Sequence, residues 1–390
     1  MKSKFDQNID RRNTHCAKWD ILMEENLDPK VLPMWVADMD FKVPEEVLEA
    51  LKKRLEHPIF GYTRTPDSYF EALIQWYKKH YDFEPKEEEI IPAPGVVPGI
   101  NQLIRCFTEI GDGIVIQTPV YHQFQEQINQ TRRKVVVNPL ICENGHYKMD
   151  YDHLDEQLKK AKMMILCSPH NPVGRLWKKE ELQKVGDLCK KHQVLLISDE
   201  IHQDIRRKGK KHFVFNTVDP SFKEFTFLCT APNKTFNIAG FKTANTMIQN
   251  PKLRKKMEEF LESIAYKGHT IFGNIAQESA YRYGEKWWRE MNEYIDENIA
   301  EVLGYFKEHI PEIRIQSPEA GYLLWLDCSK LGLTGEELQQ FFIEEAKVRL
   351  NQGQVFGEEY GDHMRMNIAT TRARCMKACE QIRKAVEKRR

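Results

Sequence analysis

The chain has 390 residues, enough to bury a large core and to form two domains or one large domain with a smaller lobe. Its 58 lysines and arginines are balanced by 58 aspartates and glutamates, so the net charge does not point to nucleic acid or an anionic membrane. A small molecule is the better expectation for a partner.

Residues 1–12 are polar and lack the apolar core of a signal peptide, and no later stretch approaches the ~18 apolar residues of a membrane span. We therefore expect a cytoplasmic protein without a membrane partner. Nine cysteines are scattered from Cys16 to Cys379 without a four-ligand pattern, which fits reduced thiols and predicts no metal site. The closest pair, Cys375 and Cys379, fits helix packing better than zinc binding.

The middle of the chain alternates short apolar runs with helical patterns, which is typical of a mostly parallel sheet with helices on both faces. The apolar runs predict buried strands over residues 114–117, 163–167, 194–198 and 225–229. Between the second and third run, residues 178–192 place Leu182, Val185 and Leu188 at helical spacing and predict a crossover helix. The predicted fold class is therefore α/β.

From about residue 285 the sequence changes to long charged helical segments, a strand-like run over 319–329 and a final basic helix ending at Arg390. This change predicts an N-terminal segment that packs with the small domain, a large domain and a small α+β domain, over residues 1–45, 46–284 and 285–390. The N-terminal segment also carries an aromatic cluster that could pack on either lobe: Trp19, Trp35 and Phe41.

Polar residues follow the predicted strands, in the loops where open parallel sheets bind their ligands. These loops read SPHNPVGR (168–175), DEIHQDI (199–205) and TAPNKTFNIAG (230–240). A pyridine-ring cofactor would need an acid at the ring nitrogen, a phosphate cradle, an aromatic platform and a lysine amine. The loops offer a candidate for each.

Asp199 and Lys234 are the first two candidates. Asp199 leaves a buried strand and can keep a ring nitrogen protonated, because an opposite charge in a low-dielectric site favours the charged form. A helix cap is an equally good local account of this residue. Lys234 lies among proline, asparagine and threonine, where desolvation can lower its pKa from ~10.4 and make it a nucleophile.

The remaining signals are weaker when each is taken alone. The backbone N–H groups of Val96 and Val97, before Pro98 at a predicted helix start, can bind a phosphate, although a plain helix start also explains them. Asn171 can present its amide to a ring hydroxyl, or can simply form an Asn-Pro turn. Tyr121 can stack on a planar ring, or can be a core tyrosine. Their shared placement at one sheet edge favours a pyridoxal phosphate site.

At this point the motifs resemble a known family, the fold-type I pyridoxal phosphate enzymes, and within it the cystathionine β-lyase-like branch of the class I/II aminotransferases. The resemblance runs essentially end to end and rests on KWD (18–20), ADMDF (37–41), FGYT (60–63), PGVVPGI (94–100), TPVYHQF (118–124), CSPHNPVGR (167–175), ISDEIH (197–202), KTFNIAG (234–240) and MRMN (364–367). It implies a three-layer fold, a homodimer, an amino-acid substrate and pyridoxal 5'-phosphate as cofactor. It also implies β-elimination from cystathionine or related cysteine S-conjugates to a thiol, pyruvate and ammonia.

The resemblance implies a role for each matching residue. Lys234 looks like the lysine that bonds to the cofactor, Asp199 like the partner of the ring nitrogen, and Asn171 like the donor to the ring hydroxyl. Tyr121 looks like the ring that stacks on the cofactor, and His202 like a histidine near the ring hydroxyl, although it also fits a structural role. Tyr62 looks like a residue that reaches the neighbouring subunit's site, and Arg365 like the residue that binds the substrate carboxylate.

Two departures and one addition concern the phosphate and the C-terminal motif. Asn233 stands where the family has a serine, which leaves one phosphate contact open, and MRMN is not followed by the usual Cys-Pro. Lys242, eight residues after Lys234, is a candidate for an added phosphate contact.

An aminotransferase would use the same lysine, aspartate and phosphate cradle, so only the family branch favours elimination. A regulatory protein with weak lyase activity is a further alternative. Substrate choice could depend on apolar residues for which packing is the simpler account: Trp35, Phe41 and Tyr322.

Overall fold

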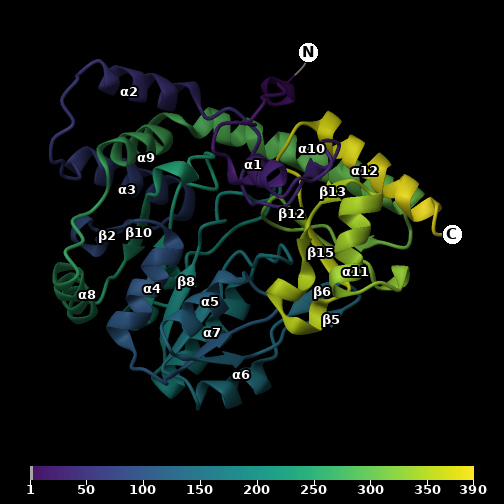
Figure 1. The fold of residues 1–390 in the computed structure, drawn as a ribbon. Coiled ribbons are helices and arrows are strands. Elements are labelled where there is room, and N and C mark those ends of the chain that lie inside the picture. Colours follow the sequence, from purple (N-terminus) through teal and green to yellow (C-terminus); the bar gives the residue numbers. More distant parts are fainter. Residues whose placement is uncertain (1–2) are drawn as a thin grey trace.

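A seven-stranded sheet lies at the centre of the molecule, in the strand order β2-β10-β9-β8-β7-β3-β4 (Figure 1). The computed structural model describes residues 3–390. The strands are β2 (Ile90–Ala93), β3 (Gly113–Ile116), β4 (Lys134–Val137), β7 (Met163–Cys167), β8 (Leu195–Asp199), β9 (Thr226–Thr230) and β10 (Ala244–Met247). Strand β10 runs in the direction opposite to the other six strands of this sheet, so the prediction of a mostly parallel sheet is confirmed.

The four predicted strands are β3, β7, β8 and β9, each within one residue of its expected position. The crossover helix between β7 and β8 is α7 (Lys179–His192), as the helical spacing of its apolar residues predicted. All residues of β7 are buried because helices cover both faces of the sheet.

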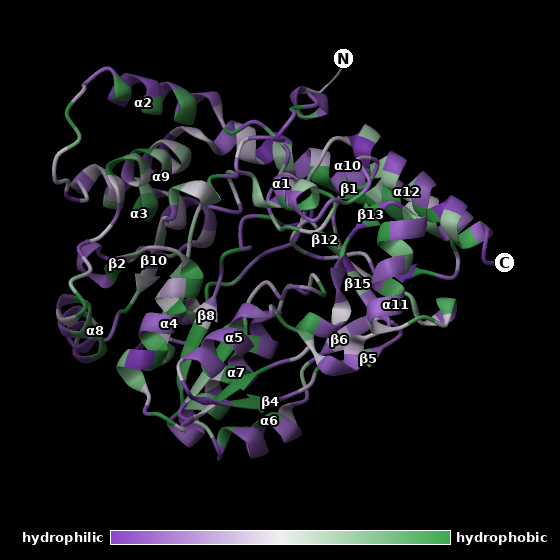
Figure 2. Ribbon diagram, viewed as in Figure 1, coloured by the Kyte–Doolittle hydropathy of each residue, from purple (hydrophilic) through white to green (hydrophobic). Residues whose placement is uncertain are grey.

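Successive residues of the strands pack into two separate cores. Met163 and Ile165 of β7 face one core together with α4 (Val96–Phe107), α5 (Gln123–Gln130) and α8 (Pro251–Ser263). Met164 and Leu166 face the other core, which includes side chains of α3 (Asp67–Tyr81), α6 (Tyr151–Leu158), α7 and α9 (Ile271–Tyr283). This alternation follows from the two-residue period of a strand and produces the three-layer fold. In Figure 2 the central strands are mostly hydrophobic, whereas the outer helix α8 is mostly hydrophilic.

The C-terminal part is a smaller α+β layer. It contains a four-stranded antiparallel sheet in the order β11 (Arg314–Ile315), β12 (Leu323–Asp327), β15 (His363–Asn367) and β14 (Asn351–Gln352). The helices α10 (Glu285–His309), α11 (Gly335–Gln340) and α12 (Arg372–Glu387) belong to the same part. The run predicted over 319–329 is β12, and the predicted final helix is α12. A separate hairpin is formed by β5 (Ile141–Glu143) and β6 (His146–Lys148).

The N-terminal segment contains α1 (Ala17–Glu24) and β1 (Leu32–Pro33), and α2 (Glu45–Leu55) follows it. Strand β1 pairs in parallel with β13 (Val348–Arg349). In the aromatic cluster, the guanidinium of Arg374 lies over Trp19 and that of Arg349 over Trp35, while Phe41 packs on Tyr294. The domain boundaries after residues 45 and 284 remain predictions. Within residues 3–390, no helix is both long enough and apolar enough to span a membrane.

Candidate active site

A pocket opens at the carboxyl ends of the central strands, with a volume of about 970 Å³ including its mouth. Cys167 and Asp199, the last residues of β7 and β8, contribute to its wall. The other lining residues come from loops far apart in the sequence: Ala37, Pro94, Gly95, Val96, Val97, Pro98, Tyr121, Asn171, Ile201, His202, Asn233, Lys234, Ala239 and Lys242. The sheet thus gathers most of the predicted site residues around one cavity.

Asp199 is a buried carboxyl group without a cationic partner. It is 4% exposed, and its Oδ1 accepts a hydrogen bond from the backbone N–H of Ile201 at 3.1 Å. Among residues 3–390, no lysine, arginine or histidine forms an ion pair with it. Desolvation by burial raises the pKa of Asp199 to about 7, against the lowering effect of that backbone hydrogen bond. A protonated ring nitrogen in the pocket would supply the missing cation.

Lys234 follows β9 and points its amine at the N-terminal segment. Its Nζ donates to the backbone carbonyl oxygen of Ala37 at 2.6 Å. Desolvation by burial lowers the pKa of Lys234 to about 8, although the carboxylate of Asp38 acts in the opposite direction. A substantial share of this amine is therefore neutral and nucleophilic near physiological pH.

Helix α4 begins at the pocket wall without a side-chain cap. Gly95 at its N-cap position has φ 151°, and the next two residues, Val96 and Val97, carry backbone N–H groups, whereas Pro98 has none. Free N–H groups and the helix dipole at such an end suit a phosphate. Lys242, whose side chain is exposed, adds a cation to the rim of the same pocket.

Asn233, where the family pattern has a serine, uses its side-chain N–H group in a hydrogen bond within the protein. Its Nδ2 donates to the backbone carbonyl of Thr243 at 2.9 Å, and its Oδ1 is buried without a partner among residues 3–390. Asn233 Oδ1 is an acceptor and cannot donate to a phosphate oxygen. The groups that can bind a phosphate here are the backbone amides at the start of α4 and the amine of Lys242.

Arg365, on β15, is 3% exposed and is bound only by neutral groups within residues 3–390. Nη1 donates to Asn171 Oδ1 at 3.0 Å, while Nη2 donates to Asn351 Oδ1 at 2.7 Å and to the Trp35 carbonyl at 3.3 Å. Desolvation lowers the pKa of Arg365 to about 10, so the group stays cationic at neutral pH. Because Asn171 Oδ1 is occupied, the amide nitrogen of Asn171 is the atom left to donate to a ligand.

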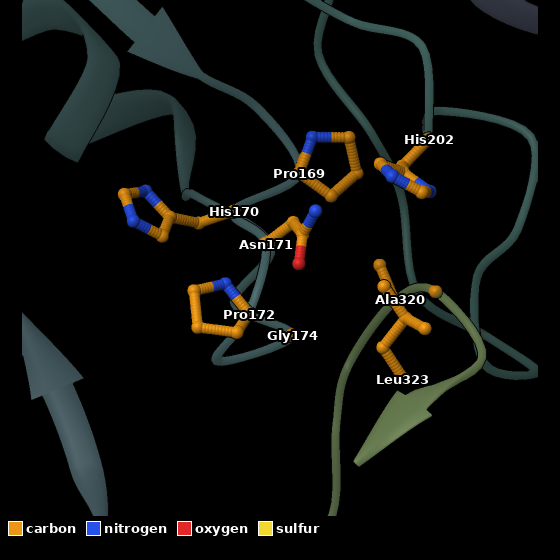
Figure 3. Close-up of a pocket in the computed structure, with 9 residues that line it drawn as sticks. Pro169, His170, Asn171, Pro172, Gly174, His202, Ala320 and Leu323 are labelled. Carbon is orange, nitrogen blue, oxygen red and sulfur yellow. The ribbon is translucent and has the colours of Figure 1, made fainter. Parts of the chain in front are cut away.

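A second, much smaller cavity adjoins the first, and Asn171 and His202 line both. Figure 3 shows these two residues on opposite sides of it, with Ala320 and Leu323 closing it from the C-terminal part. His202 is 6% exposed, and its Nδ1 has no partner in the described part of the chain. Desolvation lowers the pKa of His202 to about 3, so the ring is a neutral donor or acceptor.

Not every predicted site residue lies at the pocket. Tyr62 is fully exposed on the loop between α2 and α3 and does not reach the pocket of its own chain. Phe41 is buried against Phe5 and Tyr294. Conversely, Ala37 and Asn351 were not predicted. Ala37 contributes a main-chain carbonyl, which no side-chain motif reveals, and Asn351 lies in a short strand whose sequence has no distinctive pattern.

The groups at this pocket fit pyridoxal phosphate. One cavity is lined by the unpaired buried carboxyl of Asp199, the partly neutral amine of Lys234, the uncapped start of α4 and the aromatic ring of Tyr121. The buried guanidinium of Arg365 bonds Asn171 at its wall and can take a substrate carboxylate.

Comparisons with known proteins agree with this geometry. Residues 29–382 match the family model for aminotransferase class I and II. The cystathionine beta-lyase PatB of Bacillus subtilis (strain 168) is 37% identical over 384 residues, which cover 98% of this chain and 99% of the relative.

Two solved structures are similar over nearly the whole chain. Cystalysin from Treponema denticola, which contains a pyridoxal 5'-phosphate cofactor, has a TM-score of 0.96 at 35% identity and covers 100% of both chains. The pyridoxal phosphate-bound C–S lyase from Staphylococcus hominis has a TM-score of 0.93 at 34% identity and covers 99% of this chain and 98% of its own. The chain belongs to the aminotransferase class I and II family, and its sequence and fold place it beside the C–S lyases of that family.

Proposed function

We propose that this protein is a pyridoxal phosphate-dependent C–S β-lyase that cleaves cystathionine or related cysteine S-conjugates to a thiol, pyruvate and ammonia. The single observation that carries the proposal is the placement of three ionisable groups at one pocket, none of them bound by an opposite charge within the described residues. The part-buried Lys234 and the buried Asp199 line the pocket, and the buried Arg365 donates to Asn171 of its wall. The names of the relatives, a cystathionine beta-lyase and a C–S lyase, support elimination as the reaction.

The cofactor would be held by residues from several loops. Asp199 would bind the ring nitrogen, Asn171 Nδ2 the ring hydroxyl, with neutral His202 beside it, and Tyr121 would stack on the ring. The amides of Val96 and Val97 would bind the phosphate, with Lys242 as an added cation. When bound, pyridoxal phosphate supplies an electron sink that acidifies the Cα–H of an amino acid attached to it.

The chain's own residues would then position the substrate and move its proton. Arg365 can take the substrate carboxylate in a bidentate pair, for which a guanidinium without a competing carboxylate is suited. Lys234, as a neutral amine, can remove the Cα proton. The electron pair left on Cα expels a sulfur leaving group from Cβ, and hydrolysis of the remainder gives pyruvate and ammonia.

An aminotransferase is the second candidate, because the matching family model carries that description and the same residues serve both reactions. Transamination needs a keto acid as the acceptor of the amino group, whereas β-elimination does not. This difference separates the two reactions without any variant.

A homodimer is part of the proposal. The loop between α2 and α3 exposes three large apolar side chains, with Ile59 67%, Phe60 53% and Tyr62 112% exposed. Exposed apolar groups gathered on one loop favour an interface. We propose that a second copy covers this loop and that Tyr62 reaches the neighbouring cofactor site.

The test is to mix the cofactor-loaded protein with L-cystathionine and no keto acid, and to follow pyruvate and free thiol together. Equimolar, sustained release of both products is expected from the wild type and none from Lys234→Ala. Lys255→Ala is the matched control, because Lys255 is 77% exposed on α8 and should leave the rate unchanged. Turnover that appears only after a keto acid is added would replace the lyase proposal by the aminotransferase.

A further inference from the structure

Residues 35–38 present four consecutive backbone carbonyls to Lys234 and to two side chains of β15, Arg365 and Asn367. The carbonyl of Trp35 accepts from Arg365, and that of Ala37 accepts from Lys234. The carbonyls of Val36 and Asp38 both accept from Asn367 Nδ2, at 2.6 and 2.7 Å. One short backbone segment thus touches both the lysine and the arginine of the pocket.

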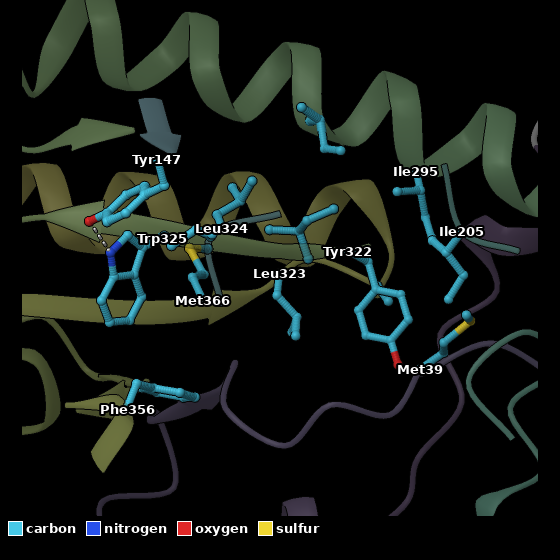
Figure 4. Close-up of a cluster of buried hydrophobic side chains, with 14 of the residues drawn as sticks. Met39, Tyr147, Ile205, Ile295, Tyr322, Leu323, Leu324, Trp325, Phe356 and Met366 are labelled. Carbon is cyan, nitrogen blue, oxygen red and sulfur yellow. Dashed lines mark hydrogen bonds between the residues drawn. The ribbon is translucent and has the colours of Figure 1, made fainter. Parts of the chain in front are cut away.

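The carbonyl of Ala37 has a second donor. The hydroxyl of Tyr322 donates to it at 3.0 Å, and the Tyr322 side chain is fully buried just before β12. Figure 4 shows the Tyr322 ring leaving the strand with its hydroxyl directed toward the segment that carries Met39. Burial raises the pKa of Tyr322 well above its usual range, so its hydroxyl keeps the proton that it donates.

The segment is fixed on its other side as well. Asn237, three residues after Lys234, donates through Nδ2 to the carbonyls of Met39 and Phe41 and accepts from the Met39 N–H at 3.0 Å. Further along, Asp40 is buried among Lys18, Arg11 and Arg374, at 3.2, 2.8 and 2.7 Å. The Ala37 carbonyl therefore belongs to a rigid backbone, and Tyr322 is its hydrogen-bonded contact from the C-terminal sheet.

We propose that Tyr322 is a positioning residue, which holds the Ala37 carbonyl as the fixed acceptor of the Lys234 amine whenever that amine is not bonded to the cofactor. A neutral amine has two N–H bonds and one lone pair. A fixed acceptor for one N–H restricts the directions in which the lone pair can point. This inference rests on the proposed role of Lys234 as nucleophile and base, and adds a residue on which its orientation depends.

Tyr322→Phe removes the hydroxyl and leaves the buried ring. Tyr147→Phe is the matched control, because the Tyr147 hydroxyl accepts from Trp325 Nε1 at 3.0 Å in the same buried layer but away from the pocket (Figure 4). The first measurement uses cofactor-free protein and follows by absorbance how fast Lys234 captures added pyridoxal 5'-phosphate. The second compares kcat and KM for L-cystathionine carrying hydrogen or deuterium at Cα.

In Tyr322→Phe we expect cofactor capture and kcat to fall roughly three- to tenfold, as for the loss of one hydrogen bond, with KM unchanged. The isotope effect on kcat should rise because proton removal becomes slower. Tyr147→Phe should match the wild type in each readout. Equal capture rates in all three proteins, or equal losses in both variants, would overturn the proposal. Capture needs no substrate, so a wild type inactive on every S-conjugate would refute the proposed reaction and still leave the Tyr322 test decisive.

Discussion

The buried carboxyl group of the pocket, that of Asp199, has fewer hydrogen-bond donors than a buried carboxylate elsewhere in the core. Asp204 is as buried as Asp199, but its carboxylate accepts from Trp76 Nε1 at 3.0 Å, from Thr235 Oγ1 at 2.7 Å and from the Tyr81 hydroxyl. Asp199 has a single backbone donor among the described residues. A buried carboxylate costs little stability when hydrogen-bond donors surround it and much more when they are absent. The ionised carboxylate of Asp199 therefore lowers the free energy of unfolding.

That cost predicts a stabilising substitution. The folded-state pKa of Asp199 is raised from 3.8 to about 7, so the folded chain holds this proton longer than the unfolded chain does. The contribution of Asp199 to stability therefore falls as the pH rises from 3.8 to about 7, by on the order of 4 kcal/mol at full ionisation. Cofactor-free Asp199→Asn should unfold at a higher temperature than the wild type at pH 8 and at a similar temperature near pH 4.

Asp204→Asn is the control for this comparison. The asparagine amide replaces one acceptor oxygen of Asp204 by an N–H donor, which then faces the donors that the carboxylate had bound. We therefore expect Asp204→Asn to lower the stability at pH 8, where Asp199→Asn raises it. A melting temperature of Asp199→Asn below that of the wild type at pH 8 would contradict the assigned cost. Asp199→Asn should also lose most of its lyase activity, because the amide of asparagine cannot keep the ring nitrogen of the cofactor protonated.

Arg365 allows a second prediction at the level of one residue. Arg365→Lys keeps the charge but loses the planar fork that binds a carboxylate through two parallel bonds. We expect KM for L-cystathionine to rise roughly 10- to 100-fold, the range for a lost charge-assisted hydrogen bond. The absorbance of the bound cofactor should not change.

Arg133→Lys provides the control, because Arg133 also donates to neutral acceptors, among them Thr108 Oγ1 at 2.9 Å. It precedes β4 and therefore lies at the amino-terminal edge of the sheet, opposite the pocket. Should Arg365→Lys leave KM unchanged, the substrate carboxylate must bind elsewhere.

At the scale of elements, the start of α4 should decide phosphate binding. Gly95 has φ 151°, and a Cβ there would lie 3.2 Å from Pro98 Cδ, so Gly95→Ala strains the turn that presents the Val96 and Val97 amides. We expect a loss of stability of about 1–3 kcal/mol and a weaker affinity for pyridoxal 5'-phosphate, measured by titration of the cofactor-free protein.

Gly111→Ala separates these two effects. Gly111 has φ 90°, and no atom of residues 3–390 outside its immediate chain neighbours lies within 4 Å of the place that a Cβ would take. Alanine there costs backbone strain without approaching the pocket, so its cofactor affinity should equal that of the wild type. If both variants lose affinity equally, general destabilisation and not the α4 amides accounts for the change.

The elements that the sequence predicted are those with continuous apolar runs, such as β7 and β8, because burial on both faces excludes polar residues. Strand β10 reads Ala-Asn-Thr-Met and was not predicted. Its polar side chains are tolerated because the core supplies partners, as when the Tyr69 hydroxyl donates to Asn245 Oδ1 at 2.8 Å. A partner so distant in the sequence cannot be inferred from a local pattern.

The same limit applies to the site. Asp199, Lys234 and Asn171 follow predicted parallel strands, whose carboxyl ends lie at the same edge of the sheet, so the sequence alone predicted that these residues lie together. The contact between Lys234 and the Ala37 carbonyl joins residues 197 positions apart through a main-chain atom. Only the tertiary path of the N-terminal segment creates it.

For the whole molecule, the proposed homodimer predicts that each copy completes the site of the other. The loop between α2 and α3 extends away from the body of the chain in Figure 1, and its Tyr62 is fully exposed. In a twofold dimer, each copy can give the same loop to its partner. Tyr62 would then act in the site of the neighbouring subunit, and Lys234 in the site of its own chain.

Mixing two inactive variants tests this arrangement. Lys234→Ala and Tyr62→Ala homodimers should each show little activity. After dissociation and reassociation together, a mixed dimer has one site with both residues intact and one site lacking both. Random mixing makes half of the dimers mixed, so about one quarter of the wild-type activity should return. If Tyr62 acted within its own chain, every site would lack one residue, and mixing would restore nothing.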